Sequence, residues 1–281
     1  MLLIEKNNIR VAILDLYDGH ANQGMRCIRE ILKQFGNKHQ LNICCDEFDV
    51  RQKQAVPDLS YDIYISSGGP GSPLDSEGSE WENVYFNWFD SVQNWNNSEH
   101  NLQKKQVFLI CHSFQLVCRY LQFGTVCLRK STSFGVFPIH LLKDGKEELV
   151  FEGMHDPFFV VDSRDYQVIE NLEGSTTAST ATILAIEKER PHVQLQRAIM
   201  AVRFNDFIIG TQFHPEADAS GMSIYLQIPD KKKNVIENHG EAKWLSMIEQ
   251  LNDPDKIMFT NEHILPNFLT NAVENLQIVE I

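Results

Sequence analysis

The stretch VFLICHSFQLVCRYL, residues 107–121, joins a short apolar run to a segment with helical spacing of its apolar residues. The run 107–110 is typical of a buried strand, and 114–121 predicts a helix. Cys111 is therefore predicted to lie in the turn between the strand and the helix. A side chain at such a turn is exposed at the carboxyl edge of a sheet, where the free N–H groups and positive dipole of the helix favour a thiolate.

Short runs rich in Val, Ile and Phe alternate with helical segments through most of the chain. This alternation predicts an α/β fold, with an open, mostly parallel sheet and helices on both faces. We expect one domain over residues 1–220 and a C-terminal helical extension over 221–281 packed on the same domain. Strands are predicted at 11–16, 41–45, 62–66, 107–110, 136–142, 158–161, 182–186, 198–204 and 208–213, and helices at 25–35, 80–95, 114–121, 241–251 and 264–276.

The composition excludes several classes of partner. Lys and Arg number 25 against 38 Asp and Glu, and the formal charge of -13 disfavours binding to nucleic acid or to an anionic membrane. No stretch approaches the roughly 18 apolar residues of a membrane span, and the first residues do not resemble a signal peptide. The six cysteines lack metal-ligand spacing. We therefore expect a soluble, unprocessed protein of the reducing cytoplasm that needs no metal or cofactor.

A candidate base follows the strand predicted at 208–213. In the extended segment His214-Pro215-Glu216, residues two apart point to the same side, so Glu216 can bind one ring nitrogen of His214. The other nitrogen is then free for Cys111, as nucleophilic catalysis requires. Taken singly, Cys111 is equally explained as an inert buried thiol and His214 as a loop histidine capped by its neighbour. His112 is a weaker candidate for the base, because its side chain should point away from that of Cys111.

The glycine-rich turn at residues 67–73, SGGPGSP, follows the strand predicted at 62–66. Glycine permits backbone dihedrals that direct N–H groups into a pocket, and such a nest can hold an oxyanion. A phosphate-binding loop is the rival interpretation, but no Gly-Lys-Ser/Thr follows and Pro70 removes one donor. A simple turn is the alternative for this segment taken alone.

Three segments together resemble a class I glutamine amidotransferase domain, in the order found in that family. Residues 67–73 resemble its glycine-rich oxyanion strand, Cys111 to Gln115 its Cys-x-x-x-Gln elbow, and Gln212 to Glu216 its Phe-His-Pro-Glu box. The resemblance extends over about residues 9–217 and implies a flavodoxin-like arrangement of the sheet. The chain resembles the glutaminase half of GMP synthetase and its free-standing relatives.

The resemblance implies a reaction and a role for each matching residue. Cys111 would attack the glutamine carboxamide, His214 would give a proton to the departing ammonia, and water would hydrolyse the γ-glutamyl thioester. Glu216 would hold the imidazole of His214. The remaining roles are implied in two groups: the backbone N–H groups of Gly69 and His112 would bind the oxyanion, and Gly71, Gln115, Ser163 and Asp165 would bind the substrate.

The chain departs from the family pattern at three places. Ser113 replaces a glycine of the elbow, where a tight backbone crossing leaves little room. Phe114 stands where histidine is frequent, which suggests a more apolar pocket wall. Asp162-Ser163-Arg164-Asp165 replaces a His-Gly-Asp-like stretch near the substrate. Glutamine specificity is therefore less firmly predicted than thiol catalysis.

Three functions remain open from the sequence. The first is release of ammonia from glutamine, either for a separate synthetase subunit or as simple hydrolysis, since no ATP-binding loop is evident in the chain. The second is a γ-glutamyl peptidase, which uses the same triad and differs in its leaving group. The third is a catalytically silent binding or regulatory subunit, which the intact Cys111, His214 and Glu216 argue against.

Overall fold

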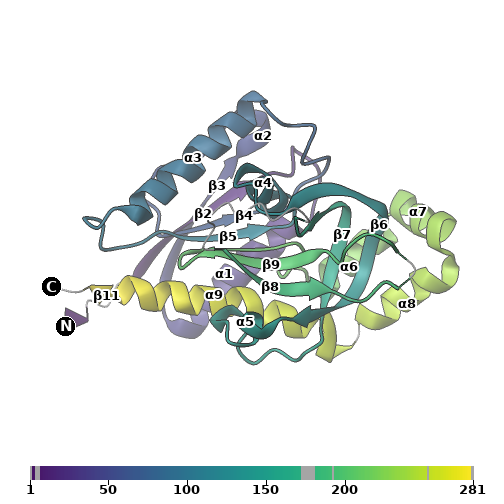
Figure 1. Cartoon of the computed structure of the whole chain (residues 1–281). Coiled ribbons are helices and arrows are strands. Elements are labelled where there is room, and N and C mark those ends of the chain that lie inside the picture. The colour runs from purple at the N-terminus through teal and green to yellow at the C-terminus, as the bar shows by residue number, and fades with distance from the viewer. Residues whose placement is uncertain (1, 4–6, 172–180, 192, 252, 280–281) are drawn as a thin grey trace.

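A computed structural model describes residues 2–3, 7–171, 181–191, 193–251 and 253–279 of the 281-residue chain (Figure 1). Its centre is a nine-stranded sheet with the order β3-β2-β4-β5-β10-β9-β8-β6-β7. The strands from β3 to β10 are parallel, and those from β10 to β7 are antiparallel. Their bounds are β2 Asn8–Asp15, β3 Asn42–Asp49, β4 Ile63–Ser66, β5 Gln106–Ile110, β6 Thr125–Leu141, β7 Phe158–Ile169, β8 Thr182–Glu187, β9 Ile199–Asn205 and β10 Ile208–Thr211.

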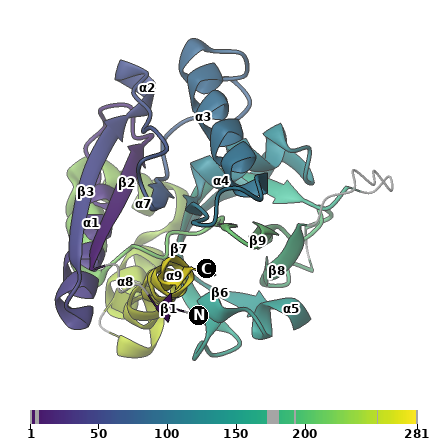
Figure 2. The same ribbon diagram turned by 90° about the vertical axis from the view of Figure 1, so that its left-hand side faces the viewer.

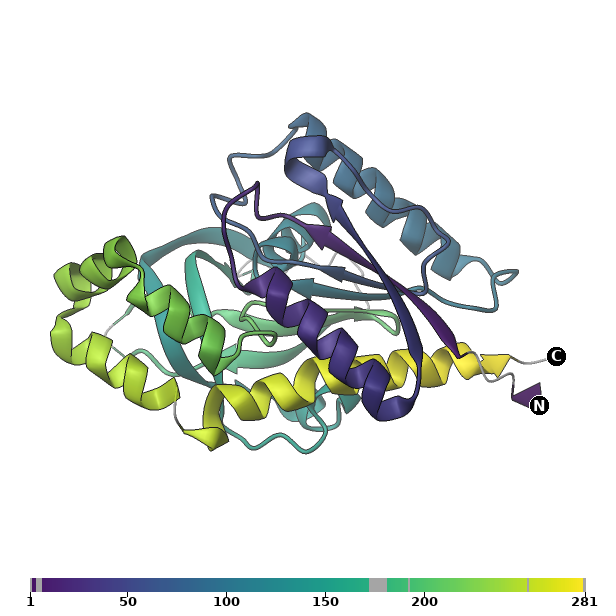
Figure 3. The same cartoon turned by 180° about the vertical axis from the view of Figure 1, so that it is seen from behind.

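Helices cover both faces of the sheet. One face packs on α1 (Gly24–His39) and α9 (Phe259–Gln277), which lie beside each other on the side of the sheet that faces the viewer in Figure 3. The other face packs on α3 (Glu80–Asn97) and α4 (His112–Tyr120). The predicted α/β fold is confirmed, and the antiparallel strands curl the sheet into a half-barrel (Figure 2).

Aromatic side chains of α3 lie in this second core. Tyr85 is fully buried and Trp88 is 3% exposed. The ring of Trp88 packs against that of Tyr64 in β4 and against that of Tyr85. Short elements complete the connections: α2 (Val50–Lys53), α5 (Lys143–Lys146) and the 3-10 turn η1 (Leu149–Phe151).

Three helices and a π-helical turn form a third cluster beside β6 and β7. They are α6 (Ala219–Gln227), α7 (Pro229–His239), α8 (Glu241–Leu251) and η2 (Pro254–Met258). Met222, Leu226, Met247 and Ile257 pack there against strand residues that include Val136 and Val161. By contrast α9 packs in the same core as α1, so the residues after 220 are held at two places on the sheet.

The chain ends lie close together. Leu2–Leu3 (β1) pairs antiparallel with Ile278–Val279 (β11), as Figure 1 shows. In the described residues no helix combines the length and apolarity needed to cross a membrane.

The largest differences from the predicted elements lie in β6 and β7. The strands were predicted at 136–142 and 158–161, but the structure pairs Thr125 with Ile169 and continues to Ile139 with Phe158. The added segments carry Arg129, Asp162 and Arg164, which read as charged loop residues in the sequence. They lie in strands because their charges are paired inside the half-barrel, Arg164 with Asp162 and Arg129 with Glu187 of β8. Helices α6 and α7 were not predicted, whereas α8 has the predicted bounds.

Candidate active site

Cys111 lies at the bend between β5 and α4. Its backbone has φ 49° and ψ −95°, in the left-handed half of the dihedral map that residues with a side chain rarely adopt. The N–H of Cys111 donates to the carbonyl of Thr211 at 2.7 Å, which ties the bend to the end of β10. The strained bend places the thiol at the carboxyl end of a parallel strand, as the sequence predicts, and only 4% of the residue is exposed.

Ser113 fits the crowded elbow through its hydroxyl. Its Oγ accepts from the N–H of Ile110 at 2.8 Å and lies 2.9 Å from the carbonyl of Ser66 and 3.0 Å from that of Ile110, to which it can donate. The residue is fully buried. The serine therefore joins β4 to β5 at the point where the family pattern has glycine.

Phe114 does not form a wall of the pocket, so this expectation is wrong. The side chain points from α4 into the core on the opposite side, where its ring lies 6.2 Å from that of Phe204. A Cβ at Gly210 would come within 2.9 Å of the Phe114 ring, so the glycine in β10 makes the room for it. Burial of an aromatic ring in this core explains the residue better than substrate choice does.

His214 and Glu216 follow β10 and face the bend. The N–H of His214 donates to the carbonyl of Val161 at 3.0 Å, which fixes the segment to β7. Nδ1 of His214 lies 2.8 Å from Oε1 of Glu216, a residue that is 1% exposed. His214 and Cys111 line the same cleft, and Cys111 is one of the neighbours that raise the pKa of the imidazole. The structure thus brings the three predicted residues together in the predicted order.

Asn261 supports Glu216 from a distant part of the chain. Its side-chain amide, on α9, donates to the backbone carbonyl of Glu216 at 2.8 Å. Residues 45 positions apart along the chain meet here, and no local motif in the sequence could reveal the contact.

The charge on His214 depends on its neighbours. Burial by itself lowers the pKa of the imidazole, but the negative charges of Glu216 and Cys111 and the hydrogen bonds to them outweigh it and hold the pKa well above 6.5.

Replacing Glu216 by glutamine should lower the pKa of His214, because the amide keeps the shape and removes the charge. Because the pKa of His214 is raised in the folded protein, the protonated imidazole stabilises the fold. This contribution is fully present below the ordinary value of 6.5 and is lost as pH rises through the raised pKa. The variant should therefore lose most stability, relative to the parent, below pH 6.5. An NMR titration of the imidazole and denaturant unfolding across pH measure both effects. An unchanged titration of His214 in Glu216→Gln, or an equal change in the exposed control Glu77→Gln, would contradict this.

The glycine-rich turn lies directly beside the triad. A Cβ on Gly68 would come within 2.8 Å of the His214 ring, and one on Gly69 within 2.3 Å of the carbonyl oxygen of Leu16. These close approaches explain the two glycines. In the described part of the chain, the backbone N–H groups of Gly69 and His112 donate no hydrogen bond, so both are free for a ligand.

Two arginines that the sequence did not single out hold this turn. Arg51 donates from Nη1 to the carbonyl of Pro70 at 2.7 Å, and Arg119 donates to the carbonyl of Pro73. Both lie near His112, whose pKa is lowered to about 3 by burial and by their positive charges. His112 is therefore neutral, and its side chain is unsuited to be a base near neutral pH.

Tyr17 is a further residue of the site that the sequence did not single out. It follows β2, and a Cβ on Gly24 would lie 2.1 Å from its hydroxyl and 3.2 Å from Oε1 of Glu216. Burial and then the charges of Glu216 and Cys111 raise the pKa of the hydroxyl well above 10. The phenol thus stays protonated, and its place after a strand at the carboxyl edge was the only signal in the sequence.

The predicted substrate-binding residues line one cleft with the triad. The cleft has a volume of about 510 Å³, and its walls include Gly71, Gln115, Ser163 and Asp165. The carbonyl of Ser163 lies 3.9 Å from Sγ of Cys111, and Asp165 accepts from the hydroxyl of Thr132 at 2.5 Å. The amide nitrogen of Gln115 already donates to Tyr166 and Gln212. Substrate binding by these four residues stays a prediction.

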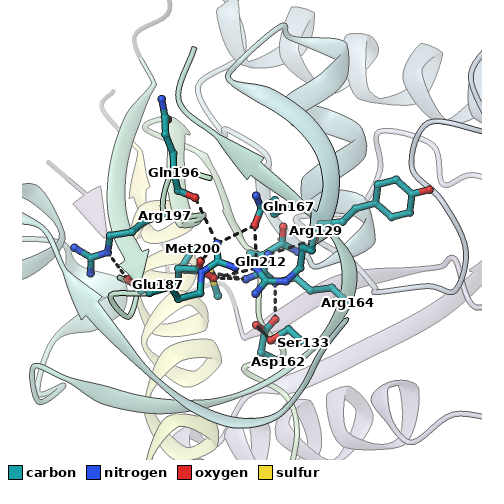
Figure 4. A network of polar contacts seen from close by, with 12 residues as sticks. Arg129, Ser133, Asp162, Arg164, Gln167, Glu187, Gln196, Arg197, Met200 and Gln212 are labelled. Carbon is teal, nitrogen blue, oxygen red and sulfur yellow. Dashed lines mark hydrogen bonds and ion pairs between the residues drawn. The ribbon is translucent and has the colours of Figure 1, made fainter. Parts of the chain in front are cut away.

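A buried ion network lies beneath this cleft inside the half-barrel (Figure 4). Arg164 is bonded to Asp162 at 2.8 Å and to Glu187 at 3.1 Å, and Arg129 is bonded to Glu187 at 3.0 Å. Side-chain exposure is 7% or less in all four residues. Gln212 links the network region to the site, since its amide bonds to Gln115 at 3.0 Å and lies 3.8 Å from Sγ of Cys111.

Comparison with known proteins gives one family and several similar structures. The family model for glutamine amidotransferase class-I matches residues 13–226. A glutamine amidotransferase from Thermotoga maritima superposes with a TM-score of 0.65 at 15% identity, covering 95% of this chain and 98% of its own. One from Methylobacillus flagellatus gives 0.63 at 15% identity, with 98% and 97% covered. The CTPS glutaminase domain of Trypanosoma brucei with bound acivicin gives 0.55 at 15% identity, with 96% of each chain covered. None of the curated proteins compared with the chain matches it significantly by sequence.

Proposed function

The chain belongs to the class I glutamine amidotransferase family, and on that premise we propose that it hydrolyses the side-chain amide of glutamine to glutamate and ammonia. The thiolate of Cys111 attacks the amide carbon, and the carbonyl oxygen becomes an oxyanion. The N–H groups of Gly69 and His112 bind this oxyanion, an interaction whose loss typically costs about 100- to 1,000-fold in rate.

His214 then acts as the acid and base of the two half-reactions. As imidazolium it gives its proton to the departing nitrogen, and ammonia leaves while the γ-glutamyl thioester remains on Cys111. The neutral imidazole next takes a proton from water, which attacks the thioester and releases glutamate. Glu216 orients the ring throughout, because its carboxylate lies 2.8 Å from Nδ1 and leaves Nε2 to face the reacting atoms.

One observation carries this proposal: a strained cysteine beside an imidazole that a buried carboxylate orients, with two free backbone donors next to it. A scaffold gains little from such an arrangement, because the positive φ at Cys111 and the buried carboxylate both cost stability.

The direct test is stoichiometry. Purified protein should release ammonia and glutamate from glutamine in equal amounts, and His214→Asn should lower the rate by roughly 100-fold or more. If neither product forms and Cys111 is intact, the alternative of a catalytically silent regulatory subunit is supported instead.

A second candidate, hydrolysis of γ-glutamyl amides larger than glutamine, is favoured by the apolar wall of the cleft. Met222, Tyr225 and Ile228 of α6 and its end line the cleft, and the Tyr225 ring packs 5.6 Å from that of Phe134. The wall follows His214 closely in the chain. Because His214 must give its proton to the leaving nitrogen, an apolar amine leaving group would extend toward this apolar wall.

Tyr225→Ala should separate the two candidates. It should lower kcat/KM for γ-glutamyl-phenylalanine by roughly tenfold, since aromatic contact is lost, and leave kcat/KM for glutamine unchanged. Steady-state kinetics with both substrates measure this. If the parent turns over only glutamine, the peptidase function is excluded.

We further propose that ammonia from glutamine passes to a separate synthetase subunit, and that the protein works in the cytoplasm. The cysteines are all unpaired in the structure, which suits a reducing compartment.

A further inference from the structure

A second hollow opens next to the catalytic cleft, and we call it the lysine cleft. It has a volume of about 360 Å³ and lies between β6, the segment after β8 and α8. Lys188 and Lys243 line it from these last two elements, with Phe137 of β6 between them. Thr132 and Phe134 line both hollows, so the two are neighbours.

The two lysines face one aromatic ring and have no acidic partner. The ammonium of Lys188 lies 4.8 Å from the centre of the Phe137 ring, and that of Lys243 lies 4.9 Å from it. Within the described ranges, no Asp or Glu forms an ion pair with either lysine. Partial burial, and then repulsion from Lys188, lower the pKa of Lys243. Two like charges are thus held together without compensation.

The acidic groups beneath the lysines are already committed to arginines. Asp162 is bonded to Arg164, and Glu187 is bonded to Arg129, Arg164 and Arg190. Figure 4 shows Arg129, Asp162, Arg164 and Glu187 gathered within the half-barrel. Three arginines against two carboxylates leave this network itself with a positive charge.

Arg190 also lines the lysine cleft. Its side chain is 10% exposed, and its Nε is buried with no hydrogen-bond partner in the described structure. The one remaining acid of the lining, Glu189, is exposed. The cleft is therefore locally cationic in a chain whose formal charge is -13.

We propose that the lysine cleft binds a small multivalent oxyanion, through phosphoryl or carboxylate groups. Lys188 and Lys243 supply positive charge, and the hydroxyl of Ser131 supplies a hydrogen bond at the same wall. Lysine binds such groups as a point charge with three donors, and an anion relieves the repulsion between the two ammonium groups. Thr132 lines both hollows and donates its hydroxyl proton to Asp165 at 2.5 Å, so the wall of the lysine cleft is joined to that of the catalytic cleft. The proposal does not depend on the reaction at Cys111.

Titration calorimetry at low salt with inorganic pyrophosphate and, separately, citrate tests this site. At least one of them should bind the parent protein, and the double variant Lys188→Gln/Lys243→Gln should bind it about tenfold or more weakly. Lys243→Arg should retain binding, because the charge remains. Tighter binding of pyrophosphate identifies phosphoryl groups as the preferred ligand, and tighter binding of citrate identifies carboxylates; either supports the site.

The control is Lys38→Gln/Lys53→Gln, which removes the same charge from exposed positions on α1 and α2. It should bind like the parent, which separates a site from the general effect of net charge. Absence of binding by both probes, or equal loss in the two double variants, would overturn the proposal.

Discussion

Replacing Cys111 by serine is expected to lower the rate of ammonia release from glutamine by roughly 10⁴- to 10⁶-fold, since loss of a nucleophile removes the covalent route. A serine hydroxyl has a far higher pKa than a thiol and cannot form the ion pair with His214 that the site is arranged to hold. The variant should fold, because the substitution is nearly isosteric and the strained backbone at φ 49° is the same. Measurement of ammonia by a coupled assay, with thermal unfolding as a check, gives both results.

Cys44→Ser is the matched control, because Cys44 is exposed on β3 at the opposite edge of the parallel strands from β10. Its activity should equal that of the parent. If Cys111→Ser keeps more than about a hundredth of the activity while folded, Cys111 is not the nucleophile of the kind invoked here.

Arg164→Met is expected to destabilise the fold by about 3–5 kcal/mol, the usual cost of removing one partner from a buried ion pair. Methionine fills a similar volume, but Asp162 loses the arginine that is bonded to it and keeps the hydrogen bond from Ser133 at 2.7 Å. Glu187 retains Arg129 and Arg190, so most of the cost falls on Asp162. Equilibrium unfolding in urea measures the free energy, and Tm should fall by roughly 10 °C.

Arg29→Met provides the comparison, because its pair with Glu47 is solvent-exposed on both sides. Exposed pairs contribute at most about 1 kcal/mol, so this variant should remain close to the parent. Equal losses in the two variants would mean that burial of the network in the half-barrel does not matter for stability.

The sequence predicted the inner strands of the parallel half of the sheet well, because β2, β4, β5 and β10 are continuous apolar runs. The runs around Val11, Ile63 and Val107 are buried on both faces, and such runs are unmistakable without knowledge of their neighbours. The long β6–β7 hairpin was underestimated for the opposite reason. Arg129 and Arg164 are buried only because acidic residues from other strands meet them, and that compensation is invisible in a single strand.

The residues of the candidate site also fall into those that the sequence predicted and those that it could not. Cys111, His214, Glu216 and Gly69 each follow a buried strand, so the rule that parallel strands end at one edge was enough to bring them together. The side chains of three helix residues, Arg51, Arg119 and Asn261, bond to backbone carbonyls far away in the sequence. Nothing in the sequence around these residues indicates those partners. Phe114 was misjudged because the direction of its side chain depends on the space left by Gly210, a residue of a different strand.

The central claim has two parts. Cys111 is a nucleophile that His214 activates, and the cleft around it binds a γ-glutamyl amide. Mass spectrometry after treatment with a glutamine-analogue electrophile tests nucleophile and substrate shape at once. The account predicts one adduct per chain, on the peptide that contains Cys111, with much slower labelling in His214→Asn and protection by glutamine. Labelling of the other cysteines at an equal rate, or no adduct on Cys111 in the folded protein, would contradict it.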